Sequence, residues 1–172
     1  RTIDGQNAVL YRLSSQSYLN RQLVNQTGST VKVVPADGQD YLLDGERNIY
    51  YSAIVEVRKY FIAGNGNHTD FIAEAIENEV PVQKAIETVL ATLGYEKNKE
   101  KTPRIVGVVP ISGDFGWLGI VREDALIVRR IELEPRLLSY IATSRLLEPG
   151  YFITDLGVTT ALDIARGFVE GH

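Results

Sequence analysis

The middle of the chain contains two consecutive helix-like segments, with short strand-like segments before and after them. Apolar residues recur every three or four positions over residues 70–79 and again from Pro81 to Leu93, which places them on one face of each helix. Thr69 is of a type that caps helices, and Gly94 can end the second helix in a left-handed conformation. The sequence therefore predicts two adjacent helices, each packed against a flat surface.

The strand-like segments are rich in β-branched and aromatic residues, as is typical of strands. They cover residues 8–13, 31–34, 53–57, 60–63, 105–109, 117–121 and 125–131. The polar stretches 14–30 and 35–48 are predicted to be loops, and residues 122–125 a hairpin turn. Residues 158–169 have a helical period, whereas residues 133–152 show no clear period and carry no prediction.

This order of elements is not the strict strand and helix alternation of a doubly wound parallel sheet. It predicts an α+β fold with mostly antiparallel sheets and with helices on their outer faces. A length of 172 residues without internal repeats or low-complexity linkers suits one domain over residues 1–172.

Composition excludes several classes of protein. The 18 Lys and Arg residues against 22 Asp and Glu residues argue against a broad surface for nucleic acid or for an anionic membrane. The chain has no cysteine, which excludes disulfides, thiolate metal sites and a cysteine nucleophile. No apolar run of about 18 residues and no leader-like segment occurs, so we expect a cytoplasmic location.

The first candidate site is the segment YRLSSQSYLNR at residues 11–21, which is dense in hydrogen-bond donors. Arginine presents a planar, permanently charged fork, and serine hydroxyls and loop amides add shorter contacts, a combination that suits phosphate. The alternative is a hydrated turn with two surface arginines, Arg12 and Arg21.

The second candidate is GNGNHTD at residues 64–70, between a strand and a helix. Its glycines permit backbone conformations in which amide groups face a ligand. The alternative is an ordinary Asn-Gly turn followed by capping residues. His68 is one of only two histidines, so a multi-histidine metal site cannot be built and no metal is expected.

The third candidate is the loop that contains Gly94–Lys97 and Lys101–Arg104, which carries a carboxylate, a phenol, a hydroxyl and a guanidinium. Catalytic groups often lie on loops held by rigid elements. The alternative is a solvated charged run, NKEK, between two elements.

Taken together, the motifs YRLSSQSYLNR, NGNHTD, YEKNKEKTPRI and WLGIVREDALIVRRI resemble the archaeal-type inosine monophosphate (IMP) cyclohydrolase family. The resemblance extends over roughly residues 1–131 and more loosely through the predicted C-terminal helix. It implies a four-layer αββα sandwich similar to that of N-terminal nucleophile hydrolases. It also implies an enzyme of the cyclic-amidine hydrolase class, which closes 5-formamidoimidazole-4-carboxamide ribotide to IMP with loss of water in purine biosynthesis. No metal, nucleotide or folate cofactor is implied.

The resemblance also implies the site residues. Glu96 would steer the amide or a proton, Tyr51 would relay a proton to the departing oxygen, and Arg21 would hold developing negative charge. The neighbouring Tyr50 is the alternative to Tyr51. The implied substrate-binding residues are Arg12, Ser15, Asn20, Asn65, Asn67, His68, Asp70, Thr102 and Arg104. Of these, Arg12, Ser15 and Arg104 are expected at the phosphate, and the turn of residues 65–70 at the base.

The expected partner is a small purine ribotide, and neither nucleic acid nor a membrane is expected. The sequence does not determine the oligomeric state, and a homo-oligomer is possible. Two other functions are compatible with the same residues. One is a purine-nucleotide binding protein without turnover. The other is an amidohydrolase on the same fold, which would need an amino-terminal Ser, Thr or Cys where this sequence has Arg1.

Overall fold

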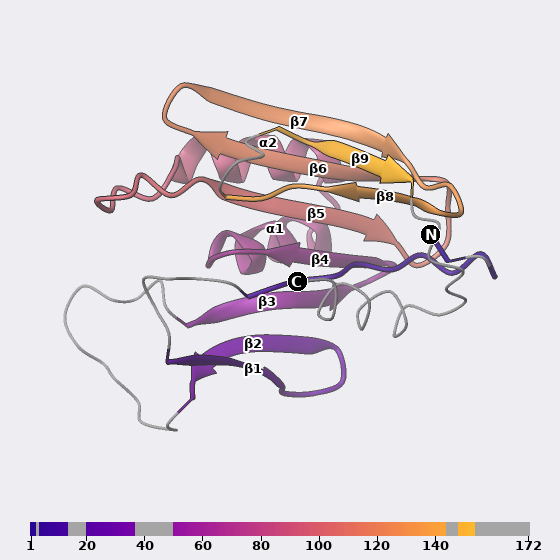
Figure 1. Cartoon of the computed structure of the whole chain (residues 1–172), viewed down its shortest axis with the longest axis horizontal. Coiled ribbons are helices and arrows are strands. Elements are labelled where there is room, and N and C mark those ends of the chain that lie inside the picture. Colours follow the sequence, from indigo (N-terminus) through magenta and orange to yellow (C-terminus); the bar gives the residue numbers. More distant parts are fainter. Residues whose placement is uncertain (3, 14–19, 37–49, 144–147, 154–172) are drawn as a thin grey trace.

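A computed structural model describes residues 1–2, 4–13, 20–36, 50–143 and 148–153, coloured along the sequence in Figure 1. Its main feature is a seven-stranded antiparallel sheet in which strands adjacent in sequence are also adjacent in space. The strands are β1 (Arg21–Asn25), β2 (Thr30–Pro35), β3 (Tyr51–Val57), β4 (Tyr60–Gly64), β5 (Arg104–Pro110), β6 (Phe115–Arg122) and β7 (Ala125–Glu132). The predicted α+β class with antiparallel pairing is confirmed.

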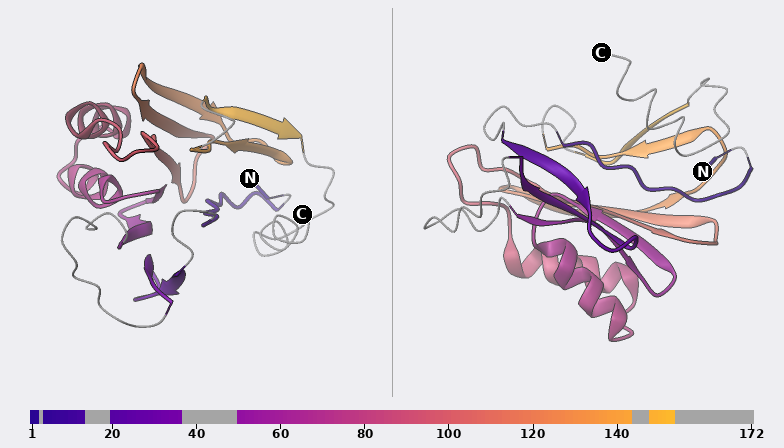
Figure 2. Two further views of the ribbon diagram at one scale, coloured as in Figure 1. Left: turned by 60° about the vertical axis from the view of Figure 1, so that its left-hand side comes forward. Right: turned by 90° about the horizontal axis from the view of Figure 1, so that it is seen from below.

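Two helices, α1 (His68–Glu77) and α2 (Val82–Leu93), connect β4 to β5 and cover one face of this sheet (Figure 2). A second antiparallel pair, β8 (Leu137–Tyr140) and β9 (Gly150–Ile153), lies on the opposite side of the sheet from the helices (Figures 1 and 2). No helix within the described ranges combines the length and the apolar character needed to cross a membrane.

The core lies between the helices and the sheet. Ile72 and Ile76 of α1 and Ile86 and Leu90 of α2 are buried against apolar residues of the sheet. Gly119 of β6 permits the close approach of α2, because a Cβ atom there would lie 2.6 Å from Cγ2 of Ile86. The helical period of these two segments places their apolar residues on one face, and that face packs against the sheet.

Six of the seven predicted strands and both central helices are found, with small differences at their ends. α1 begins at His68, so the prediction that Thr69 caps it is wrong: Thr69 lies inside the helix, where its hydroxyl donates to the carbonyl of Gly66 at 2.9 Å. Gly94 ends α2 with a φ of 64°, as predicted. The turn between β6 and β7 also falls within the predicted residues 122–125.

Two predictions in the first quarter of the chain are wrong. Residues 8–13 are extended but form no ladder; Tyr11 and Leu13 instead pack against a small cluster of Val33, Tyr51 and Ala53. Residues 21–25, predicted as part of a loop, form the edge strand β1. The stretch without a prediction, residues 133–152, contains β8 and most of β9. The predicted helix over residues 158–169 lies outside the described residues.

Candidate active site

The topology brings the starts of three strands to one end of the sheet. Because the strands are antiparallel, β1, β3 and β5 begin at the end where β4 finishes. Arg21, Tyr51 and Arg104 are the first residues of β1, β3 and β5. The start of α1 and the loop of residues 94–103 lie at the same end. Segments that are far apart in sequence therefore place polar side chains together at this end.

A register shift in β3 directs Tyr51. Opposite Val31 and Lys32 of β2 the pairing passes from Ile54 directly to Ser52, so Ala53 is left without a partner in β2. Such a bulge changes which residues of a strand share a face. Tyr51 consequently packs with Val33 and Tyr11, and not with the core beneath the helices.

Tyr51 is buried and hydrogen-bonded to a second tyrosine. Its side chain is only 6% exposed, and its hydroxyl lies 2.6 Å from the hydroxyl of Tyr11. Arg21, the first residue of β1, acts on Tyr51 as well, because its positive charge lowers the pKa of that phenol. Burial raises the pKa of Tyr51, although Tyr11 and Arg21 both oppose that rise, so Tyr51 is a protonated phenol at neutral pH.

Glu96 lies on a loop that is ordered by its own polar groups. The amide of Glu96 donates to the carbonyl of Thr102, at 2.9 Å. Asn98 accepts from the amide of Thr102 and donates to its hydroxyl, both at 2.9 Å, and its amide nitrogen also lies 3.4 Å from the Glu96 carboxylate. Residues 96–102 therefore form a closed turn that carries Glu96 toward β5.

The Glu96 carboxylate is paired with arginine in a half-buried setting. Its Oε1 lies 3.5 Å from Nη1 of Arg104, and both side chains are largely shielded from solvent. Burial raises the pKa of Glu96, whereas the charges of Arg104 and Arg21 lower it. Glu96 is thus electrostatically coupled to both arginines, one from β1 and one from β5, and it also acts on the pKa of Tyr51.

Arg104 joins this carboxylate to the start of α1. It is 7% exposed, and Nη1 also donates to Oδ1 of Asn67 at 3.2 Å. Gly66 makes room for it, because a Cβ there would lie 2.9 Å from Nη1 of Arg104 and 3.2 Å from Nδ1 of His68. The buried Nε of Arg104 has no hydrogen-bond partner among the described residues.

His68 is fully buried behind Gly66. Its Nε2 lies 2.8 Å from the carbonyl oxygen of Ile105, which can only accept, so Nε2 bears the proton and Nδ1 is an acceptor. Nδ1 is also buried and has no partner in the described part of the chain. Burial lowers the pKa of His68 to about 4, and His68 is therefore neutral at physiological pH.

Asn65 fixes the geometry beneath these groups. Its side-chain amide donates to the carbonyl of Pro103 at 2.9 Å, and its oxygen accepts from the amide of Ile105 at 2.8 Å. These contacts extend the pairing of β4 with β5 beyond the last residue of β4. The predicted contact between Asn65 and substrate stays a prediction, while the observed contacts are to backbone.

The structure brings together some of the predicted site residues and separates others. Arg21, Tyr51, Glu96, Asn67 and Arg104 are linked by direct contacts or by electrostatic coupling, and Thr102 closes the loop of Glu96. Arg12, Asn20 and Asp70 are exposed, with Asp70 in the first turn of α1. Tyr50 is half-buried next to Tyr51, and Ser15 lies outside the described residues.

Sequence reasoning missed two residues of this site. Tyr11 opens the first motif, but only the packing of residues 8–13 on the sheet brings its hydroxyl to Tyr51. Asn98 falls in the charged run NKEK, where its neighbours suggest a solvated loop. Its spacing of two from Glu96 and four from Thr102, within a tight loop, is the signal that could have identified it.

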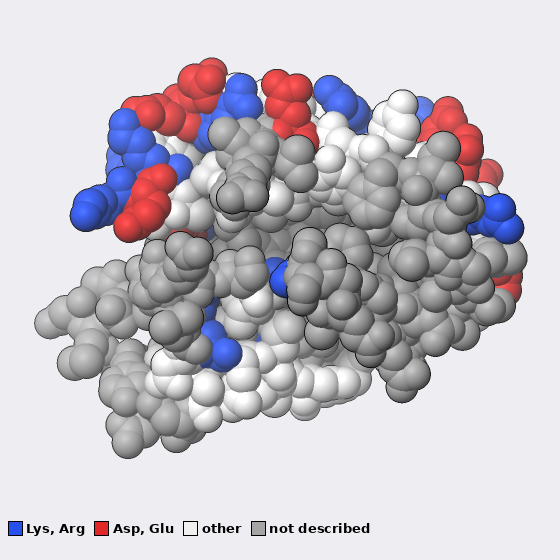
Figure 3. Space-filling view, viewed as in Figure 1, with Lys and Arg blue, Asp and Glu red and all other residues white. Residues whose placement is uncertain are grey.

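The face of the molecule that is seen in Figure 3 carries charges of both signs. In Figure 3, acidic and basic side chains gather over β6 and β7 and over the loop before β5, and basic atoms also lie in the hollow at the centre of this face. No group of three His, Cys, Asp or Glu residues placed to hold a metal ion is found in the ranges that the structure describes.

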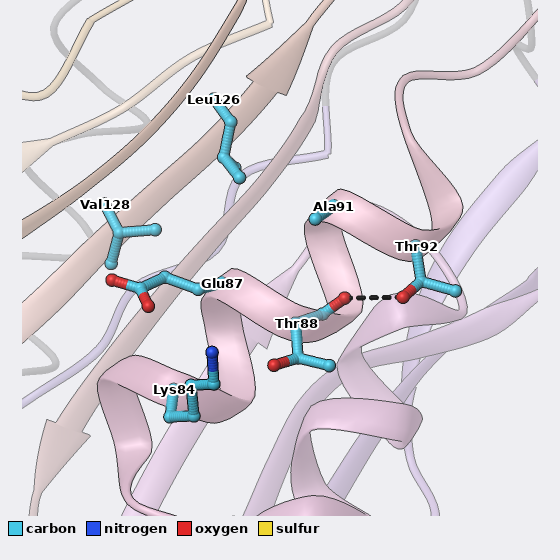
Figure 4. Close-up of a pocket in the computed structure, with 7 residues that line it drawn as sticks. All are labelled: Lys84, Glu87, Thr88, Ala91, Thr92, Leu126 and Val128. Carbon is cyan, nitrogen blue, oxygen red and sulfur yellow. Dashed lines mark hydrogen bonds between the residues drawn. The ribbon is translucent and has the colours of Figure 1, made fainter.

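A separate groove lies between α2 and β7, away from this cluster (Figure 4). It has a volume of about 600 Å³ and is lined by Lys84, Glu87, Thr88, Ala91, Thr92, Leu126 and Val128. In Figure 4, the hydroxyl of Thr92 donates to the carbonyl of Thr88, at 2.7 Å. None of the predicted site residues lines this groove, so the cluster at the sheet end is the candidate active site.

Comparisons with known proteins agree with the motifs. A family model described as "IMP cyclohydrolase-like protein" matches residues 1–170. The chain is 36% identical over 137 residues to the IMP cyclohydrolase of Haloquadratum walsbyi, covering 80% of this chain and 67% of that protein. It is 34% identical over 144 residues to that of Methanococcus aeolicus, covering 83% and 69%. It is also 34% identical over 170 residues to that of Thermococcus kodakarensis, covering 97% and 80%.

Proposed function

Because this chain belongs to the IMP cyclohydrolase-like protein family, we infer that it is an IMP cyclohydrolase, an enzyme of purine biosynthesis. The family match over residues 1–170 is the observation that carries this conclusion. The substrate is 5-formamidoimidazole-4-carboxamide ribotide, and the product is IMP. The coupling of Arg21, Tyr51 and Glu96 at one end of the sheet supports placing the reaction there.

The reaction needs orientation and proton transfer. The carboxamide nitrogen attacks the formyl carbon, forming the new C–N bond and losing one of its two protons, while the formyl oxygen takes up a proton and becomes a hydroxyl. That hydroxyl then leaves as water, taking a second proton, and the formamido nitrogen loses its hydrogen as the ring becomes aromatic. A site that holds the two arms face to face supplies most of the rate enhancement for such an intramolecular attack.

We assign three roles in this step. Burial raises the pKa of Glu96 toward the range where a carboxylate can accept a proton from the amide and return it. Tyr51, a protonated phenol, donates toward the departing oxygen. Arg21 holds the negative charge that develops on that oxygen during attack, since a preorganised cation costs no reorganisation at that moment.

Substrate binding is assigned to groups around this centre. Arg104 and Asn67 contact each other beside Glu96 and are proposed to contact the ribotide through donors of the guanidinium and amide. The exposed Arg12, together with Ser15 and Arg104, is proposed at the phosphate, where charge-assisted hydrogen bonds contribute roughly 1.5–3 kcal/mol each. Asn20, Asn65, His68, Asp70 and Thr102 complete the proposed set.

The resemblance also carries a proposal about architecture. Helices on one face of the large sheet and the β8–β9 pair on the other provide three of the layers expected in an αββα sandwich. We propose that residues 158–169 form a helix of the fourth layer and that residues 1–172 are one domain. A solved structure of the chain in which residues 158–169 do not form a helix over the β8–β9 side would contradict this proposal.

Ring closure by the purified chain tests the function. The formamido ribotide is mixed with protein and the ultraviolet absorbance of the closing ring is followed, with IMP affinity measured by calorimetry. We expect turnover without added cofactor. IMP binding without turnover would support the alternative of a non-catalytic nucleotide-binding protein.

Glu96→Gln tests the proton-transfer role. Glutamine keeps the size and hydrogen-bonding reach of Glu96 but cannot accept a proton, so kcat is expected to fall about 10²–10⁴-fold with IMP affinity retained. Glu100→Gln, an exposed glutamate of the same loop, is the matched control and should leave kcat unchanged. Near-normal turnover of folded Glu96→Gln protein would remove Glu96 from the mechanism.

A further inference from the structure

The roles assigned above leave one close contact of the site unused. The hydroxyls of Tyr11 and Tyr51 lie 2.6 Å apart, a distance typical of a short O–H···O hydrogen bond. Tyr11 belongs to the extended segment before β1 and is partly buried, packed against the cluster of Val33, Tyr51 and Ala53. Its ring therefore holds its hydroxyl in place beside Tyr51.

Either hydroxyl could donate in this contact, and counting protons shows what each direction would mean for the substrate. A phenol oxygen has one proton to donate and two lone pairs to accept with. Arg21 lowers the pKa of Tyr51, and because a guanidinium has no lone pair, Arg21 can only donate toward that hydroxyl. If Tyr51 also donated to Tyr11, its only proton would be used within the protein.

We propose that Tyr11 is a positioning residue that donates its hydroxyl proton to Tyr51, so that the proton of Tyr51 points to the departing oxygen of the substrate. Both lone pairs of Tyr51 are then filled, one by Arg21 and one by Tyr11. The hydroxyl of Tyr51 can no longer rotate freely, and one direction is left for its proton. This inference rests on the proposed cyclohydrolase function.

This arrangement needs both phenol protons in place. Burial raises the pKa of both tyrosines, so both protons are present at neutral pH.

Tyr11→Phe removes the hydroxyl and keeps the ring that packs on the sheet. We expect kcat to fall about three- to tenfold, the size of one lost neutral hydrogen bond, with KM and IMP affinity within about twofold of wild type. Tyr60→Phe is the matched control, since Tyr60 begins β4 at the other end of the sheet and packs on Trp117. It should leave kcat unchanged.

A double-mutant cycle shows whether Tyr11 acts through Tyr51. Tyr51→Phe alone should lower kcat more than Tyr11→Phe, and adding Tyr11→Phe to it should cause no further loss. Melting temperatures of all variants check folding. Additive losses, an unchanged kcat in Tyr11→Phe, or a loss that appears only in KM would each overturn the inference. Absence of ring closure by the unaltered protein would contradict the proposed function itself, and this inference with it.

Discussion

Burial shifts the three ionisable side chains at the centre of the site toward their neutral forms. It raises the pKa of Tyr51 and of Glu96 and lowers that of His68 to about 4. Arg21 and Arg104 keep their charges and oppose the rise for Glu96. The site therefore combines fixed cations with groups that can gain or lose a proton, which suits a reaction whose charge develops on one oxygen.

The buried His68 should make folding sensitive to mild acid. Its pKa is about 4 in the folded chain against about 6.5 in an unfolded one, so between these values the unfolded state binds the proton more readily. The stabilisation is complete above pH 6.5 and declines as the pH falls toward 4, by about 3 kcal/mol in total. Urea unfolding at pH 7 and at pH 4 measures this difference.

His68→Gln supplies the comparison, because glutamine can still donate to the carbonyl of Ile105 but does not titrate. The loss of stability between pH 7 and pH 4 should be about 3 kcal/mol smaller in this variant than in the wild type. Carboxylates titrate over the same range in both proteins and cancel in the comparison. Equal pH dependence in the two proteins would mean that His68 is not held neutral by the fold.

The order of the motifs along the chain identified more residues of the candidate site than the chemical type of each residue did by itself. Arg21, Tyr51 and Glu96 are separated widely in sequence, and only the order of the motifs suggested that they meet. Tyr11 and Asn98 were missed because their roles arise from contacts that the fold creates, one across to β3 and one within a closed loop. Local propensity contains no information about such contacts.

At the scale of elements, composition gave wrong predictions for two segments, because whether a segment pairs as a strand does not depend on how apolar it is. Residues 8–13 (AVLYRL) look like a strand, but they form no ladder: Tyr11 and Leu13 are partly buried by packing on the sheet, and Leu10 is exposed. Residues 21–25 (RQLVN) are largely exposed at the sheet edge, so no apolar alternation marks them. Pairing with β2 determines their structure, through a turn in which Gly28 has a φ of 79°.

Substitutions at two glycines should distinguish effects on the stability of the fold from effects on the geometry of the site. A Cβ at Gly119 would lie 2.6 Å from Ile86 and 3.0 Å from Val106, inside the core under α2. Gly119→Ala should therefore cost about 1–3 kcal/mol of unfolding free energy, as overpacking does, with kcat unchanged at a temperature where the protein is folded. Urea unfolding and the ring-closure assay measure the two effects.

The matching change at the site is Gly66→Ala. Its Cβ would meet the guanidinium of Arg104 and Nδ1 of His68, and it would displace Arg104 from Asn67 and Glu96. We expect IMP affinity and kcat each to fall about tenfold, with a smaller loss of stability than in Gly119→Ala. Loss of stability alone, with normal activity, would show that the exact place of Arg104 is unimportant for the reaction.

Over the whole molecule, the sheet separates the helical core from the face that leads to the site. The segment of residues 7–13 crosses this face, on the side away from α1 and α2 (Figure 2). It is fixed at one end by Asn7, which donates to the carbonyls of Pro110 and Gly113, and at the other by the contact of Tyr11 with Tyr51. The site is thus completed by a segment that spans the sheet.

A ligand that bridges these parts should stabilise the molecule as a unit. At a concentration 100 times its dissociation constant, IMP should add about 2.7 kcal/mol to the unfolding free energy, or about 5–10 °C in Tm for a chain of this size. Hydrogen exchange should slow at the starts of β1, β3 and β5 and in the loop of residues 94–103, but not along the outer side of α2.

Lys84→Ala, in the groove between α2 and β7, should keep the full increase in Tm, because that groove is separate from the cluster. Arg21→Ala should reduce it. The reverse result, with the increase lost in Lys84→Ala and kept in Arg21→Ala, would place the nucleotide in the groove and contradict the site assigned to the sheet end.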